Sequence, residues 1–329
     1  MPYQRRHNRW SEIRDILADL KSLEADPRYR KAARLNAEFF RTARTPFSFL
    51  WWLLFKAPKL RRRREDIVEL LDLPLPRWQK AVLETLSWFE VWLGALKLIR
   101  DHIIGELETM CRTKQEPIVI ASFGCGGMEL ERQISYQLLR KRFKFPLVFI
   151  GIDYSASSFE VARAKFDNLL SRGMVEIKTV DHLGSKELAE IKAAARPDCF
   201  SLVFLHEDAF RLRELPENSF DLVYHTRLRH HLTPEERQRL DDLAVYLAPR
   251  VVELDDISSV IGIIIVSIFV WRFPSVLNGA VLSYLRDFSQ EELVANREDG
   301  WNVVFAGRPL RSYLRLHDKP GLTAPAATG

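Results

Sequence analysis

Cysteine is scarce in this chain, with only three among 329 residues. Cys111, Cys125 and Cys199 are scattered and lack the spacing of metal ligands, which excludes a cysteine-based metal site. The start of the sequence, Met1 to His7, is polar and does not resemble a secretory signal. These features predict a protein of the reducing cytoplasm that holds no metal.

Long hydrophobic runs are also absent. The most apolar run, Ile257 to Trp271, has fifteen residues, whereas a helix that spans a bilayer needs about 20. A second apolar run, Pro46 to Phe55, is shorter still. We therefore expect no membrane-spanning helix. We find no internal repeat, and a chain that is 47% hydrophobic can bury a complete α/β core and leave room for an additional helical domain.

Acidic residues are rare near the N-terminus, although the formal net charge of the chain is only +5. Residues 1–64 contain 17 Lys and Arg and 6 Asp and Glu, a local charge of +11, which leaves −6 for the remainder. The aromatic run Pro46 to Phe55 is followed directly by Lys56, Lys59 and Arg61 to Arg64. Aromatic residues beside cations suit an anionic membrane interface, where each cation contributes ~1 kcal/mol. Alternatively, the run packs on the rest of the protein beside solvated arginines, or the cluster binds nucleic acid.

The most informative segment is a strand, a glycine turn and a helix in succession. An apolar run that begins at Pro117 leads into the turn Gly124 to Gly127, and Glu129 to Ile134 follow at helical spacing. Glycines permit positive φ and close approach of the backbone to a ligand, and the free N–H groups of the helix start point at that ligand. A second apolar strand, Leu147 to Asp153, ends in a carboxylate about one βαβ unit downstream, where an acid can bind ribose hydroxyls. The two pieces together predict a nucleoside site.

These segments resemble the class I S-adenosylmethionine (SAM)-dependent methyltransferases. The resemblance is closest to the small-molecule branch, typified by the ubiquinone and menaquinone biosynthesis methyltransferases. The matching segments keep the family's order from Pro117 to Leu316. They are the glycine turn, Gly151 to Ser155 with Ala162 and Arg163, Glu207 to Phe210, Leu215 to Tyr224 followed by Leu228 to Leu232, and Leu247 to Asp255.

The resemblance implies a Rossmann-like α/β sheet and SAM as the cofactor. The resemblance further implies that Asp153 would bind the ribose hydroxyls, that Asp208 would accept from the adenine amino group, and that the glycine turn would lie against the methionine moiety and ribose. The residues assigned to cofactor binding are Gly124, Cys125, Gly126, Gly127, Asp153, Tyr154, Asp208 and Ala209.

A base would help if the acceptor is a phenol or an acidic carbon. His225, at the end of the fourth strand of the family's fold, is the best placed candidate, because ligands of open α/β sheets lie at the carboxyl ends of strands. His230 and His231 are next, and a structural role for these two stays open.

The sequence departs from the family's pattern at the glycine turn. The first strand of the family commonly ends in an acid, which here is Ser122, and the third glycine is replaced by Met128. Glu129, just after the turn, is a candidate for part of the acid's role. The segment Tyr224 to Thr226 lacks the Asn/Asp-Pro-Pro-aromatic signature of the enzymes that methylate amino groups of nucleic acids, so no nucleic-acid partner is expected.

Three regions are predicted along the chain: a helical region at 1–115, the methyltransferase domain at 116–318 and a disordered tail at 319–329. Ser11 to Leu20, with Ser11 as N-cap, and Leu83 to Ile104 have helical periodicity. The insertion Gly173 to Cys199 is longer than the family needs, and it contains a predicted helix at Ser185 to Ala195.

The apolar run Ile257 to Trp271 follows the fifth strand of the family's fold, where the small-molecule branch places a lid helix over the acceptor. An apolar lid implies an apolar acceptor, and core packing or a dimer interface is the alternative.

Two functions are open on the sequence alone. The first is methyl transfer from SAM to a small, mainly apolar acceptor such as a quinone, a lipid or an aromatic natural product, in the cytoplasm or at the inner face of a membrane. The second is a non-catalytic SAM-binding or interaction protein that works through its basic helical region.

Overall fold

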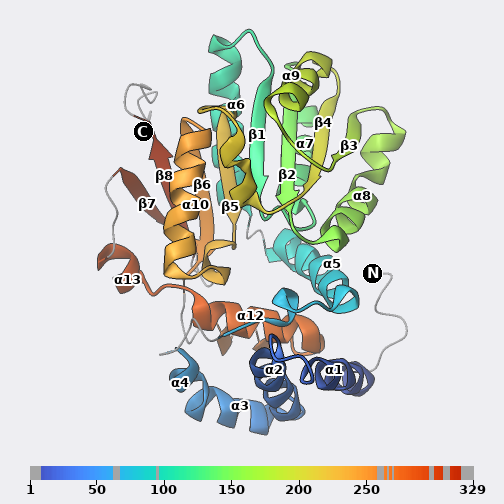
Figure 1. The fold of residues 1–329 in the computed structure, drawn as a ribbon, viewed down its shortest axis with the longest axis vertical. Coiled ribbons are helices and arrows are strands. Elements are labelled where there is room, and N and C mark those ends of the chain that lie inside the picture. The colour runs from blue at the N-terminus through green and yellow to red at the C-terminus, as the bar shows by residue number, and fades with distance from the viewer. Residues whose placement is uncertain are drawn as a thin grey trace. The chain divides into compact units, whose positions relative to one another are not determined.

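The computed structural model describes residues 9–61, 67–93, 96–257, 263–264, 267–268, 270–295, 300–306 and 312–319. The chain divides into two compact units (Figure 1). A helical unit comprises Met1–Glu90, Asp256–Ala295 and Gly307–Ser312, and a sheet unit comprises Val91–Asp255, Asn296–Ala306 and Tyr313–Gly329. Each unit has a hydrophobic core made of its own residues.

The sheet unit is built on an eight-stranded sheet with the strand order β3-β4-β2-β1-β5-β6-β8-β7. Strand β1 pairs in parallel with β2 on one side and β5 on the other, and the parallel pairing continues to β4 and β3 and to β6. Successive strands are therefore added on opposite sides of β1, which makes the carboxyl ends of β1 and β5 a topological switch point. The strands are β1 (Ile118–Phe123), β2 (Leu147–Asp153), β3 (Val175–Val180), β4 (Phe200–His206), β5 (Leu222–Thr226), β6 (Arg250–Asp256), β7 (Trp301–Ala306) and β8 (Ser312–Asp318).

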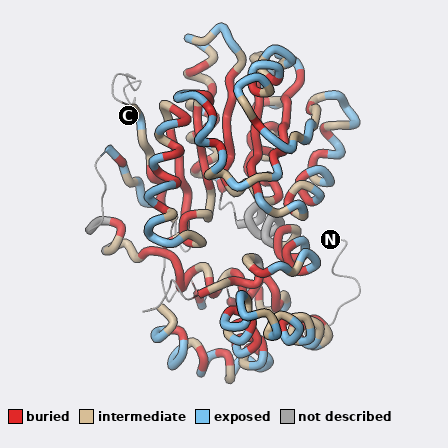
Figure 2. Tube along the Cα trace, in the orientation of Figure 1, coloured by how far each residue is buried: buried red, intermediate tan, exposed pale blue. Residues whose placement is uncertain are grey.

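Helices cover both faces of this sheet, so its central strands are buried throughout (Figure 2). Along β1, Ile118 and Ile120 point into one core, and Val119 and Ala121 point into the other, as the two-residue period of a strand requires. The first core is closed by α6 (Lys97–Thr113), α7 (Glu129–Arg140) and α8 (Ala156–Ser171). The second is closed by α9 (Ser185–Ala194), the 3-10 helix η4 (Ala209–Glu214) and α10 (Pro234–Leu247). The short 3-10 helix η5 (Arg229–His231) follows β5.

The helical unit packs its own helices around aromatic side chains. Its elements are α1 (Arg9–Leu23), α2 (Arg30–Thr42), α3 (Pro46–Phe55), α4 (Ala57–Arg61), η3 (Leu70–Asp72), most of α5 (Pro76–Leu93), α12 (Pro274–Arg286) and α13 (Gln290–Ala295). Phe39 lies edge-to-face on Phe40 and on Trp52, with ring centroids 5.5 and 5.2 Å apart. Leu277 and Leu282 of α12 are buried in the same cluster.

The predicted fold class, an α/β Rossmann-like sheet with an N-terminal helical region, is confirmed by this strand order. The predicted strand at 147–153 is present as β2, and the predicted helix at 185–195 is present as α9. One strand was not foreseen. β3 lies at the edge of the sheet, where its partly exposed residues give only a weak hydrophobic signal.

The predicted boundary at residue 115 differs from the division in the structure. Ile99, Ile103 and Leu107 of α6 are buried in a core of the sheet, so α6 belongs to the sheet unit. The stretch 83–104 is not one helix, because α5 ends at Leu93 and α6 begins at Lys97. α1 already begins at Arg9, so Ser11 is not its N-cap. Residues 256–295 belong to the helical unit again, and no local sequence pattern predicts this return of the chain.

Three other predictions concern segments that the structure describes only in part. In that part of the chain, no helix combines the length and the apolar character that crossing a membrane needs. Within the run 257–271, Ile263 and Val270 are buried in the core of the helical unit, and Ile264 and Ile268 are exposed. The start of the chain, Arg62 to Arg64 and residues 320–329 lie outside the described residues, so the disordered tail stays a prediction.

Candidate functional site

The glycine turn lies at the carboxyl end of β1, beside the switch point. Gly124 and Gly126 have φ of +62° and +51°, the left-handed region that favours glycine. A Cβ on Gly124 would lie 2.9 Å from Leu228, in the loop that follows β5. Met128, where the family pattern has its third glycine, also has a left-handed φ of +49°, and its buried side chain lies over Gly151. The backbone therefore keeps a glycine-like turn at a position where glycine is missing.

Asp153 joins this turn to the end of β2. Its Oδ2 accepts from the backbone N–H of Gly126 at 2.8 Å, and its Oδ1 accepts from the N–H of Ser155 at 2.8 Å. Burial raises the pKa of Asp153, while these hydrogen bonds favour the ionised form. The side chain of Ser158 is also hydrogen-bonded to Asp153, and a carboxylate has about four acceptor sites, so one site remains for a further hydrogen bond.

A second buried carboxylate, which the sequence did not identify, lies on the first turn of α7. Glu131 accepts a hydrogen bond of 2.6 Å from the hydroxyl of Tyr224 on β5, and it is also hydrogen-bonded to Ser122 at the end of β1. Burial raises the pKa of Glu131 and of the neighbouring Cys125 thiol. An acid is thus present beside Ser122, although it comes from a helix and not from the strand. The signal that could have found it is the helical spacing, which turns Glu131 toward the sheet.

Glu129, the acid proposed from the sequence, is engaged elsewhere. Its two carboxylate oxygens accept from Arg132 at 2.6 and 3.2 Å, and Gln133 donates to it at 3.2 Å. Lys165 of α8 lies 3.8 Å from Glu129 and donates to the carbonyl oxygen of Gly127 at 3.0 Å. These groups hold the far side of the turn and leave Glu131 as the carboxylate next to Ser122.

The other predicted cofactor residues follow β2 and β4, which are neighbours in the sheet. Asp153 and His206 are paired in register, and His206 Nε2 lies 2.8 Å from the carbonyl oxygen of Tyr154. Asp208 is the exposed N-cap of η4, where its Oδ1 accepts from Phe210 N at 3.0 Å, and Ala209 follows it. The end of β4 is therefore adjacent to the acid that ends β2.

His225 lies inside the sheet unit. Its side chain is 0% exposed, and neither ring nitrogen has a hydrogen-bond partner among the described residues. Burial lowers the pKa of His225, and the nearby charge of Glu253 opposes this only in part, so the ring is neutral at neutral pH. His225, Asp241 and Glu253 place ligand atoms within 4.8 Å of one another.

That acidic cluster is already neutralised by arginine. Arg315 bridges Glu253 at 2.7 Å and Asp241 at 3.1 Å, and Arg229 lies 3.2 Å from Asp241. Burial alone would raise the pKa of Glu253, but the charges of Arg315 and Arg229 outweigh it and lower that pKa. Two guanidinium groups in the cluster would repel a divalent cation, so we interpret it as a structural ion network.

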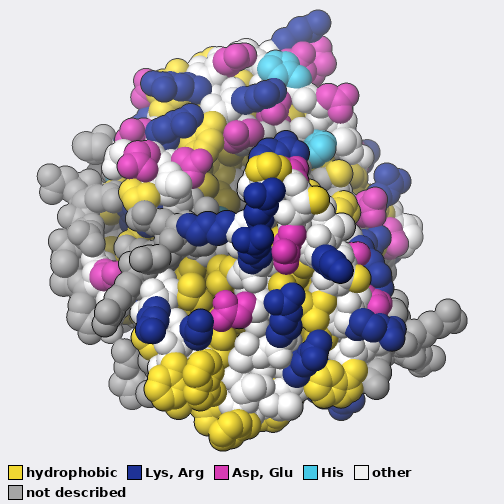
Figure 3. Space-filling model, turned by 60° about the horizontal axis from the view of Figure 1, so that its bottom comes forward, with side chains coloured by type: hydrophobic (Ala, Val, Ile, Leu, Met, Phe, Trp, Pro, Cys, Tyr) yellow, Lys and Arg dark blue, Asp and Glu magenta, His cyan; other side chains and the backbone are white. Residues whose placement is uncertain are grey.

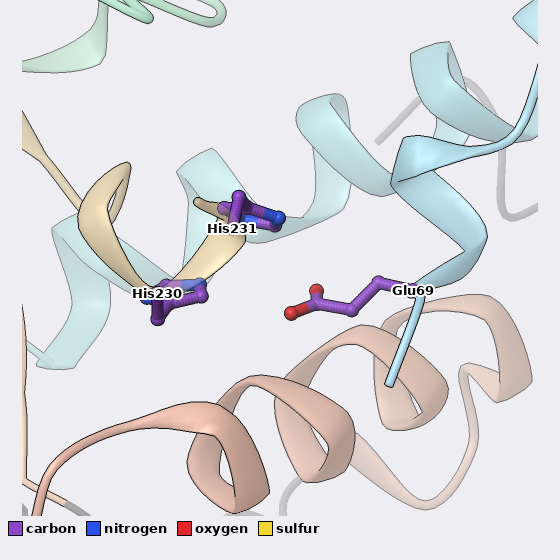
Figure 4. A group of neighbouring side chains, drawn as sticks. All are labelled: Glu69, His230 and His231. Carbon is purple, nitrogen blue, oxygen red and sulfur yellow. The ribbon is translucent and has the colours of Figure 1, made fainter. Parts of the chain in front are cut away.

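His230 and His231 lie side by side on η5, with ring centroids 4.3 Å apart (Figure 4). Glu69, also drawn there, belongs to the helical unit. His230 Nδ1 lies 2.9 Å from Asp255 Oδ1 near the carboxyl end of β6, and both side chains are buried. A carboxylate on one nitrogen of an imidazole fixes its orientation and stabilises its protonated form. His230 is therefore a predicted histidine whose ring a buried carboxylate orients.

A groove of about 510 Å³ lies elsewhere in the sheet unit. It runs between α10 and the strands β7 and β8, and Asp242, Trp301 and His317 are among its lining residues. The glycine turn and Asp153 do not line it.

Comparison with known proteins identifies no curated relative of this chain. No family model and no curated protein matches it. Among solved structures it is similar to the plantazolicin methyltransferase BpumL in complex with SAH, at 13% identity over 92% of this chain and 99% of that chain, with a TM-score of 0.41. It is also similar to the CurJ carbon methyltransferase, at 13% identity over 92% and 70% of the two chains, with a TM-score of 0.47. A possible exported protein from Bordetella parapertussis is similar at 12% identity over 97% and 99%, with a TM-score of 0.44. These values are too low to transfer a function.

Proposed function

We propose that this chain binds SAM in its sheet unit and transfers the methyl group to a small, mainly apolar acceptor. The observation that carries the proposal is the 2.8 Å hydrogen bond from Gly126 N to Asp153 Oδ2. It joins the glycine turn after β1 to the acid that ends β2, directly beside the switch point where open α/β sheets bind their ligands. The order of the motifs along the chain, which resembles that of the methyltransferases, supports the same interpretation.

The residues around the turn fit such a cofactor. The left-handed glycines bring the backbone close to a ligand, and the start of α7 directs N–H groups toward it. Asp153 retains acceptor capacity for ribose hydroxyls, and Asp208 is an exposed acceptor next to it at the end of β4. A bound SAM supplies a methyl group already activated on a sulfonium, so the protein mainly orients the reactants and excludes water.

Glu131 supplies the acid that the first strand lacks. Its carboxylate is hydrogen-bonded to Ser122 and Tyr224, and no arginine bridges it in the described structure. A buried carboxylate in this setting can accept from the ammonium group of a methionine moiety, which would also offset the cost of burying its charge.

Features of the loop after β5 support the acceptor half of the proposal. Leu228 lies over Gly124, so an apolar side chain borders the turn on that side. Where the acceptor must lose a proton, His230 is better suited than His225 to act as the base. Asp255 can orient the ring of His230 and stabilise its imidazolium form. The role of His225 as a base stays a prediction.

Calorimetric titration with SAM tests the proposal. Asp153→Asn keeps an acceptor oxygen but removes the charge, and losing a charged hydrogen bond costs ~1.5 to 3 kcal/mol, so affinity should fall at least about tenfold. Asp198→Ala, an exposed acid at the opposite end of β4, is the matched control and should bind like the parent. Absence of SAM binding in the folded parent chain would refute the proposal. If SAM binds but no labelled methyl group reaches a lipid or quinone extract, the chain is a SAM-binding protein without this activity.

A further inference from the structure

Helix α3 is apolar on two sides, and only one of them is used inside the protein. On the inner side, Phe49 and Trp52 are buried in the helical unit. Phe39 lies edge-to-face on both of them, and Trp271 contacts Phe49 with ring centroids 5.3 Å apart. Thr45 caps the start of the helix through a hydrogen bond from Ser48 N, so the helix is anchored in a fixed orientation.

The outer side presents five large apolar side chains to solvent. They are Phe47, Leu50, Trp51, Leu54 and Phe55, which are 49% to 81% exposed. Their spacing places them on one helix face, and the rings of Trp51 and Phe55 are 5.4 Å apart. Figure 3 shows hydrophobic side chains gathered at the lower edge of one face of the molecule, with Lys and Arg side chains beside them. A single exposed leucine needs no explanation, but a contiguous face of this size marks an interaction site.

The charges nearest to α3 along the chain are all positive. Between residues 39 and 64 the sequence has eight Lys and Arg and no Asp or Glu. Arg41, Arg44, Lys56 and Lys59 are exposed, and of these four only Lys56 has an ion pair within the described structure, to Glu38 at 3.2 Å. Arg61, by contrast, is bound inside the helical unit to Glu292 at 2.9 Å and to the carbonyl oxygen of Leu285. The cations available to a partner are therefore those that flank α3 in sequence.

We propose that the outer face of α3 docks on an anionic lipid surface. An apolar face with aromatic residues, bordered by cations, matches a bilayer interface, where rings and leucines enter the acyl boundary while Lys and Arg remain among the headgroups. RNA would be gripped by stacking on exposed rings, which leaves Leu50 and Leu54 without a partner. The helix is ten residues long, so it lies on a membrane and does not cross it. This inference does not depend on SAM binding.

Sedimentation of the full chain with vesicles tests the inference. Phosphatidylcholine vesicles are compared with vesicles in which phosphatidylserine replaces part of that lipid, each at low and high salt. The parent should sediment with the anionic vesicles and detach as salt shortens the electrostatic range, to about 10 Å at 0.1 M. Arg41→Gln with Arg44→Gln should weaken binding about thirtyfold, since each cation near such a surface contributes about fivefold. Phe47→Ser with Leu54→Ser should weaken it roughly tenfold or more through lost apolar burial.

Matched controls come from exposed residues of the sheet unit. Arg172→Gln with Lys186→Gln removes the same charge, Tyr246→Ser with Val304→Ser removes comparable exposed apolar groups, and both variants should bind like the parent. All variants are first shown by circular dichroism to keep the parent's melting profile. A parent that ignores anionic vesicles at low salt would overturn the proposal. So would a parent that is dimeric without lipid while Phe47→Ser with Leu54→Ser is monomeric, because the face would then join two copies of the chain.

Discussion

The two buried carboxylates beside the glycine turn differ in what stabilises their charge. Asp153 accepts backbone N–H groups on both oxygens, which is the environment of an acid fixed in place to bind hydroxyls. Glu131 is buried beside the neutral hydroxyls of Tyr224 and Ser122, and the charge of Lys165 offsets only part of the burial that raises its pKa, so a cationic ligand would further stabilise its ionised form. At the scale of single residues, Glu131 is therefore the group most sensitive to a positively charged ligand.

We expect Glu131→Gln to weaken SAM binding without destabilising the fold. The amide keeps the shape and an acceptor for Tyr224, but it loses the charge that the methionine ammonium would meet, a change of ~1.5 to 3 kcal/mol and thus at least about tenfold in affinity. Calorimetry measures the affinity, and thermal unfolding without ligand should show no loss of stability, because a buried charge is removed.

Glu129→Gln is the internal control for that measurement. Glu129 is paired with Arg132, so this change should lower stability more than SAM affinity. The opposite outcome, affinity lost in Glu129→Gln and retained in Glu131→Gln, would restore the role that the sequence suggested for Glu129.

The site was predictable from sequence only where its chemistry is local. A glycine turn after a strand and an acid at the end of the next strand are fixed by the chain's own order, and the structure places Gly126 and Asp153 in contact. Their role in SAM binding stays a prediction. Glu131 and His230 have roles set by partners 93 and 25 residues away, Tyr224 and Asp255, which no spacing rule supplies.

At the scale of elements, local periodicity predicted where helices form, whereas it predicted neither the start of α1 nor the packing of α6. The local sequence Ser289-x-x-Glu292 forms a capping box at the start of α13, with Glu292 N bonded to Ser289 Oγ at 3.2 Å and Ser289 N bonded to Glu292 Oε2 at 2.7 Å. α6 shows the limit. Its periodicity identifies a helix, but an apolar stripe does not state which core will bury it.

A core substitution in α6 tests its assignment to the sheet unit. Ile103 is fully buried against that core, and Ile→Ala changes cost ~2 to 5 kcal/mol, so Ile103→Ala should lower the stability of the sheet unit by about that amount. Urea denaturation with and without SAM measures this, because the transition that SAM shifts reports the unit that binds it. Lys97→Ala, an exposed change on the same helix, should stay within about 0.5 kcal/mol of the parent. An unchanged SAM-dependent transition in Ile103→Ala would return α6 to the helical region.

At the scale of the whole molecule, the chain forms two units from interleaved segments. Residues 256–295 leave the sheet after β6 and contribute α12 to the core of the helical unit, and the chain then returns to form β7 and β8. Sequence alone could not predict this path, because both units contain apolar helices with the same period. Each unit still has a core of its own, and every residue proposed for SAM binding lies in the sheet unit.

Hydrogen exchange with and without SAM should therefore change in one unit only. A ligand that binds the folded state stabilises it by RT ln(1 + [L]/Kd), about 2.7 kcal/mol at 100 times Kd, and slows exchange in the segments that unfold with its site. We expect added protection in β1, β2, α7 and α8, measured by mass spectrometry of their peptides, and unchanged exchange in α1 to α3. Equal protection in both sets would mean that the two cores unfold together, and the helical unit could not then be treated as an independent folding unit.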